Sequence, residues 1–162
     1  PAELGLCRNL SHRNHRRADK NKASGPVWNG FLAAQVVLGS RVLFNTSTVA
    51  QLLLPASSGT KKAYDKHHLF PANFLKNGPY EYAKDRRANF VCVDYQKNIY
   101  ISDEDPKIYV AKFKEALGDE AYKTSCTENA LPLGFEDMEY LDFLKERRVL
   151  MSQMIKNAFS RL

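Results

Sequence analysis

A short alternating segment set among helical patterns constrains this chain most. Residues 89–95 read NFVCVDY, where β-branched and aromatic residues recur at strand spacing. The polar segment KAYDKHHLF at residues 62–70 is short enough to be a second strand, and Pro71 gives it a plausible end. We therefore expect a hairpin whose strands are separated by a long, basic loop.

Most of the remaining chain shows helical spacing. Helices are predicted from Val27 to near Gly39, over TVAQLLL behind a Ser47 or Thr48 cap, over PANFLKNG, over QKNIYIS, over PKIYVAKFKEALG behind Asp105 and Pro106, and from about Asp137 to the end. On the helix after Asp105, the expected buried stripe comprises Ile108, Val110, Ala111, Phe113 and Leu117. The expected fold class is therefore α+β, mainly helical, with a hairpin embedded among α-helices.

Positive charge is concentrated in the first part of the chain. Residues 1–66 hold ten Lys or Arg against three Asp or Glu, whereas residues 67–162 hold fourteen against fifteen. Such an excess favours a polyanionic partner, because binding to phosphates releases condensed counterions, but it is equally typical of a solvated positive face. Residues 1–24 are polar and free of Phe, Trp and Tyr, which predicts a basic arm or linker before a domain at 25–162. The start at Pro1, without an initiator Met, predicts a fragment of a longer protein.

Cysteine usage and hydropathy indicate the compartment. Cys7, Cys92 and Cys126 are odd in number and far apart, which favours a reducing environment over a disulfide framework. No window approaches the roughly 18 apolar residues of a membrane span, and no signal sequence is apparent. We expect a cytoplasmic protein without a membrane partner. A zinc site from Cys7, His12 and His15 lacks a convincing fourth ligand, so we do not expect one.

Two adjacent histidines, His67 and His68, are the most specific chemical feature. Neighbouring side chains on a strand point to opposite faces, so both imidazoles reach one pocket only where the strand ends or bends. One ring can then hold a metal while the other accepts a proton from water near neutral pH. The alternative is a pair of half-exposed histidines in a polar loop.

The wider pattern resembles the HNH nucleases. Their motif is an Asp or His followed by a catalytic His, an apolar residue, any residue and Pro, then a scaffold Asn and a last His or Asn on a helix. In this chain the matching residues are Asp65, His67, His68, Leu69, Phe70, Pro71, Asn89 and Asn98. Residues 25–162 also resemble the C-terminal domain of GmrSD-like and SspE-like modification-dependent restriction proteins. The resemblance implies a ββα-metal hairpin as the nuclease centre.

The resemblance also implies roles for single residues. His68 becomes the general base that activates water, His67 and Asn98 become ligands of one divalent ion, and Asn89 ties the loop to the hairpin. Asp65, two residues before His67 on the strand, is a further candidate ligand. An imidazole in place of the commoner Asp suits Mn²⁺ better than Mg²⁺, which prefers oxygen. Phosphate contacts are expected from the basic residues around the hairpin, namely Lys61, Lys62, Lys66, Arg86, Arg87 and Lys97.

The implied function is a metal-dependent endonuclease that nicks or cuts DNA, possibly modified phage DNA, in anti-phage restriction. Its partner would be an N-terminal ParB-like NTPase or sensor domain on the same or another chain. The alternative is a non-catalytic nucleic-acid-binding module on the same ββα scaffold, and RNA cleavage is a third reading.

Overall fold

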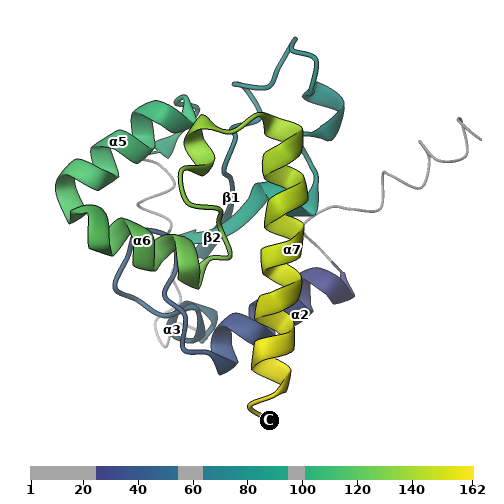
Figure 1. The fold of residues 1–162 in the computed structure, drawn as a ribbon, viewed down its shortest axis with the longest axis vertical. Coiled ribbons are helices and arrows are strands. Elements are labelled where there is room, and N and C mark those ends of the chain that lie inside the picture. Colours follow the sequence, from purple (N-terminus) through teal and green to yellow (C-terminus); the bar gives the residue numbers. More distant parts are fainter. Residues whose placement is uncertain (1–24, 55–63, 95–100) are drawn as a thin grey trace, which may run out of the picture.

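The computed structural model describes residues 25–54, 64–94 and 101–162 (Figure 1). Their fold is α+β and mainly helical, as predicted. The helices are α2 (Pro26–Val37), α3 (Val49–Leu53), α5 (Pro106–Leu117), α6 (Asp119–Glu128) and α7 (Tyr140–Phe159), with 3-10 turns η1 (Glu81–Ala83), η2 (Arg87–Asn89) and η3 (Phe135–Asp137). Strands β1 (Tyr64–His68) and β2 (Phe90–Asp94) form one antiparallel pair. In the described part of the chain, no helix is both long and apolar enough to span a membrane.

The hairpin lies in the middle of the molecule, with α5 and α6 to one side and α7 to the other (Figure 1). Its register pairs His67 with Val91 and His68 with Phe90. The three central residues of β2, Val91 to Val93, are fully buried, so the strand packs on both faces. That burial explains why β2 is nearly continuous in apolar residues. Strand β1 is more polar because Lys66 is exposed and Asp65 and His68 are half-buried.

Several local signals are confirmed by the structure. Helix α2 spans the first predicted helix, and α3 begins with a capping box in which Thr48 and Gln51 bond each other's backbone N–H groups. Asp105 caps α5 by accepting a hydrogen bond from Lys107 N at 2.8 Å, and Pro106 occupies the first helical turn. These ends were predictable because each cap depends only on residues next to it in sequence.

The helix predicted over PANFLKNG is wrong. Residues 71–78 form one helical turn, closed by a 3.1 Å bond from Leu75 N to Pro71 O, and then a series of turns. Asn77 takes a left-handed conformation, with φ of 60°, which a helix cannot continue through. The predicted helix over QKNIYIS falls mainly outside the described residues.

The predicted face of α5 and the predicted start of α7 also need correction. On α5 the buried side chains are Tyr109, Val110 and Phe113, whereas Ile108, Ala111 and Leu117 are exposed. Helix α7 begins at Tyr140 rather than near Asp137, because Glu139 caps it through bonds from the N–H groups of Leu141 and Asp142. The buried face of α7 includes an arginine as well as its apolar residues.

That arginine, Arg147, holds η2 against α7. Its side chain is fully buried, and it donates hydrogen bonds to the backbone carbonyls of Ala88 at 2.7 Å and Asn129 at 3.5 Å. Its hydrogen-bond partners are carbonyl oxygens rather than carboxylates. Burial lowers the pKa of Arg147 to about 9, so the side chain stays charged at neutral pH and the carbonyls accept charge-assisted bonds.

We expect Arg147→Met to lower the free energy of unfolding by about 3 kcal/mol, because two buried carbonyls lose their donor. Arg148→Met is the matched control: Arg148 is exposed, and we expect a change within about 0.5 kcal/mol. Urea unfolding followed by circular dichroism measures both values. Equal losses in the two variants would contradict the assigned role of Arg147.

Candidate active site

The two histidines at the end of β1 occupy different environments. His67 is 6% exposed, and its ring meets the ring of Tyr109 edge-on, with centroids 6.3 Å apart. His68 lies on the opposite face of the strand, half-buried, with its ring centroid 4.2 Å from that of Phe90. This is the alternation that a strand imposes on neighbouring residues.

Both histidines nevertheless border the same pocket, because β1 ends at His68 and the chain turns away toward Pro71. The pocket is open and measures about 460 Å³, and five further residues line it, one on β1 and the others in the segments that follow the two strands. They are Lys66, Pro71, Ala72, Ser102 and Asp103. The strand end therefore brings together two imidazoles that the strand itself would keep apart.

Asn89 fixes the turn that follows His68. Its side chain is fully buried and makes three hydrogen bonds of 2.9 Å: Oδ1 accepts from Phe70 N, and Nδ2 donates to Phe70 O and Lys84 O. The backbone of Asn89 adds a fourth, accepting from Leu69 N at 2.8 Å. The side chain thus ties the loop to the hairpin, which is the position expected for it from the sequence.

Leu69 is held from the other side by α5. Tyr109 Oη donates a 2.8 Å hydrogen bond to Leu69 O, and the phenol is fully buried. Burial raises the pKa of Tyr109 far above its ordinary value, so the hydroxyl keeps its proton and remains a donor. Asn89 and Tyr109 together fix the backbone on which His67 and His68 depend.

The sequence did not indicate Asp85, which contacts His68. Asp85 Oδ1 lies 3.2 Å from His68 Nε2, across the loop between the strands. An ionised carboxylate can only accept, so the bond assigns the proton to Nε2 and leaves Nδ1 as the unprotonated nitrogen. The one available signal was a lone acidic residue in the basic run KDRR.

Asp103 is the second residue that the sequence missed. It lies on the pocket wall opposite β1, where its Oδ2 accepts a 3.4 Å bond from Asn73 Nδ2. Two imidazoles and one carboxylate thus line the same open pocket. Within residues 25–54, 64–94 and 101–162, no three His, Cys, Asp or Glu side chains lie close enough to share one ion.

The other predicted site residues divide into three groups. Lys66 lines the pocket, whereas Asp65 is half-buried, does not line it, and accepts a bond from Lys66 N through Oδ1 at 2.8 Å. Arg86 and Arg87 line a different pocket, on the far side of η2. The remaining four lie outside the described residues: Lys61, Lys62, Lys97 and Asn98.

Comparisons with protein-family models, curated proteins and solved structures find no match to this chain. The resemblance to HNH nucleases therefore depends on its motif residues alone.

We expect Asn89→Asp, an isosteric change, to lower the free energy of unfolding by about 3 kcal/mol at pH 7, because a carboxylate oxygen then faces two carbonyls. Those carbonyls and the burial raise the pKa of the new carboxyl in the folded state, so the folded state binds its proton first. The deficit relative to wild type should therefore shrink as the pH falls from 7 to 5.

Urea unfolding at both pH values measures this deficit. Asn157→Asp, the same change at an exposed position of α7, is the control and should change little. A deficit that grows on acidification would contradict the assigned hydrogen bonds.

Proposed function

We propose that this protein is a metal-dependent HNH endonuclease that hydrolyses phosphodiester bonds of DNA. The observation that carries the proposal is the shared pocket of His67 and His68 at the end of a hairpin, with the turn fixed by Asn89. A pair of surface histidines in a polar loop would need neither the buried amide nor the fixed turn. In this proposal the antiparallel pair β1 and β2 serves as the two strands of a ββα hairpin.

His68 acts as the general base. Since Nε2 donates to Asp85, the lone pair on Nδ1 takes a proton from water as the water oxygen attacks phosphorus. The bond from phosphorus to the 3′ oxygen breaks, and that oxygen takes up a proton from solvent. The products are a 5′-phosphate and a 3′-hydroxyl.

Asp85 orients the imidazole and stabilises the imidazolium that forms in this step, as a carboxylate does beside a catalytic histidine. Its side chain is 51% exposed, so a loop residue rather than the buried core controls the orientation of the base. Phe90, packed on the His68 ring, restricts rotation from the other side.

The candidate metal ligands are His67, Asn98 and Asp65, with Asp103 added by the structure. A bound divalent ion supplies positive charge next to the phosphoryl oxygens and the leaving oxygen. The burial of His67 against Tyr109 fixes one imidazole donor in place before any ion binds. Lys66, exposed on the pocket wall, is placed to contact a neighbouring phosphate without reading sequence.

The biological setting follows from the resemblance to GmrSD-like and SspE-like restriction proteins. We propose that cutting is directed against phage DNA, including modified DNA, and that target choice belongs to a ParB-like NTPase or sensor domain. The isolated chain should therefore cut with little sequence preference.

We expect the protein to convert supercoiled plasmid to relaxed or linear DNA with Mn²⁺, and more slowly with Mg²⁺. His68→Ala should reduce the rate at least about 100-fold, because the general base is lost. His15→Ala, the same change outside the motif, should leave the rate unaltered. Agarose gel time courses measure all three rates.

Cleavage that is absent with every divalent metal, while plasmid binding persists, would favour the non-catalytic binding module. Preferential cutting of RNA in the same assay would reassign the substrate.

We expect Asp85→Asn to lower kcat about tenfold with little change in KM, because the amide cannot stabilise the imidazolium as a carboxylate does. Asp137→Asn is the matched control: Asp137 is also exposed and also pairs with one cation, Lys107, at 3.3 Å. Steady-state cleavage of a labelled oligonucleotide separates kcat from KM. An unchanged kcat for Asp85→Asn would remove Asp85 from the mechanism.

A further inference from the structure

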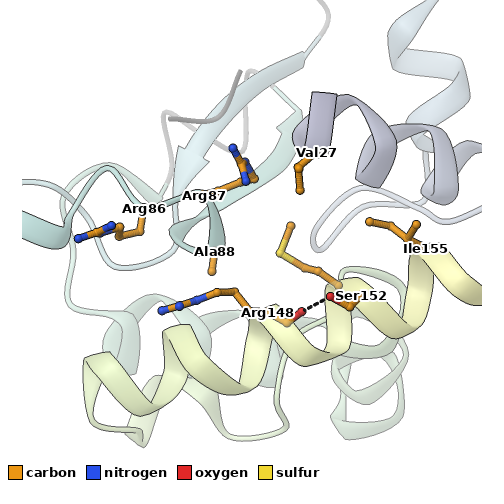
Figure 2. Close-up of a pocket in the computed structure, with 8 residues that line it drawn as sticks. Val27, Arg86, Arg87, Ala88, Arg148, Ser152 and Ile155 are labelled. Carbon is orange, nitrogen blue, oxygen red and sulfur yellow. Dashed lines mark hydrogen bonds between the residues drawn. The ribbon is translucent and has the colours of Figure 1, made fainter. Parts of the chain in front are cut away.

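A second pocket lies where η2 meets α7 and the start of α2 (Figure 2). Its volume is about 270 Å³, and it is more enclosed than the pocket beside the histidines. Asp85 contacts His68, and the next three residues of the chain line this second pocket. None of the residues that line this pocket has a role in the proposed reaction.

Three arginines border this pocket: Arg86, Arg87 and Arg148. Among the described residues, no Asp or Glu lines it. Arg87 Nε is buried and has no hydrogen-bond partner in the described part of the chain, and a buried guanidinium N–H without an acceptor is costly. Arg148 Nε donates to Leu144 O at 2.9 Å, which fixes the guanidinium plane and leaves both Nη groups for a ligand. An anion in this pocket would supply the acceptor that Arg87 Nε lacks among the described residues.

The floor between the arginines is apolar. It is formed by Val27, Ala88, Met151 and Ile155, so a fully hydrated anion such as free phosphate would leave it uncovered. An occupant that fits both the arginines and the apolar floor has negative charge at its edge and a flat, weakly polar group at its centre. A nucleotide has this construction, because its base can lie on apolar side chains while its phosphate accepts from arginine.

The placement of the arginines distinguishes one kind of nucleotide. Figure 2 shows the guanidinium groups of Arg86 and Arg148 on one side of Ala88, and that of Arg87 on the other side, toward Val27. A nucleotide inside a strand has a phosphate at both its 5′ and its 3′ side, whereas a free mononucleotide has one. Cations at both ends of the floor therefore match a nucleotide within a strand.

We propose that this pocket binds one unpaired nucleotide of a DNA strand, with its base on the Ala88, Met151 and Ile155 floor and its flanking phosphates on the three arginines. The proposal deepens the proposed function and rests on it, since one short segment contacts His68 through Asp85 and lines this pocket through Arg86, Arg87 and Ala88. It requires the base to leave the duplex, so single strands bind this pocket better than duplexes.

The test measures binding rather than cutting. Fluorescence anisotropy of a labelled single-stranded oligonucleotide, in EDTA and in the His68→Ala background, gives the Kd without metal or hydrolysis. We expect Arg148→Gln to weaken binding about tenfold, because charge-assisted bonds to a phosphate are lost. Arg161→Gln, the same change at an exposed position beyond the end of α7, should leave the Kd within about twofold.

A second pair of variants tests the pocket itself without removing a charge. Ser152 is exposed and lines the pocket, so Ser152→Phe should fill it and weaken binding about as much as Arg148→Gln does, while Ser152→Ala should bind as wild type. An oligonucleotide with one abasic position in every three should bind more weakly than the intact strand, because it offers the floor fewer bases.

Four results would overturn the proposal. They are wild-type binding by both Arg148→Gln and Ser152→Phe, an equal loss with Arg161→Gln, equal affinity for the abasic strand, and displacement of the strand by free dAMP at equal nucleotide concentration. The last result would reassign the pocket to a free mononucleotide. Failure of plasmid cleavage leaves these measurements unaffected, so the two proposals stand or fall separately.

Discussion

The buried bond from Arg147 to Ala88 O is the contact on which the functional half of the molecule depends. A guanidinium without a carboxylate inside the core is expensive unless carbonyl dipoles surround it, and the turn η2 supplies such a dipole where α7 passes. The bond fixes the place where β2 begins, and so the position of Asn89 and the register of the hairpin. An apolar residue at position 147 could fill the same volume, but it could not orient the turn.

Residues 85–89 concentrate several tasks in five consecutive positions. Asp85 faces His68, Arg86 and Arg87 face the second pocket, Ala88 accepts from Arg147, and Asn89 closes the loop. This is possible because an extended Arg86 leads into the 3-10 turn of residues 87–89, so the side chains leave in more directions than the two faces of a strand. One short segment thereby connects the core, the histidine pocket and the arginine pocket.

The sequence predicted what depends on near neighbours and missed what depends on distant ones. The caps of α3 and α5, both strands and the fold class followed from local pattern. The buried face of α5 was misassigned, because Ile108 and Tyr109 are equally suited to a core and only the position of β1 and α6 decides between them. Asp85, Asp103 and the carbonyl partners of Arg147 lie 17 or more residues from their contacts, and no periodicity encodes such a pairing. The histidine pair and Asn89 are distant in sequence too, but their residue types and spacing match a motif, so the sequence did indicate them.

The amide of Asn89 bonds the backbone of Phe70 as a paired strand residue would, although both strands have ended there. By pairing with both backbone groups of Phe70 and with Lys84 O, it clamps the two ends of the loop that lies between them. The entropy of closing a loop grows only with the logarithm of its length, so once the ends are clamped the intervening segment is thermodynamically free to lengthen or shorten. A change in the length of this segment would leave the positions of His67 and His68 unaltered. Residues 76–82 are therefore the part of this fold where new contacts to a substrate could be added or removed without rebuilding the site beside them.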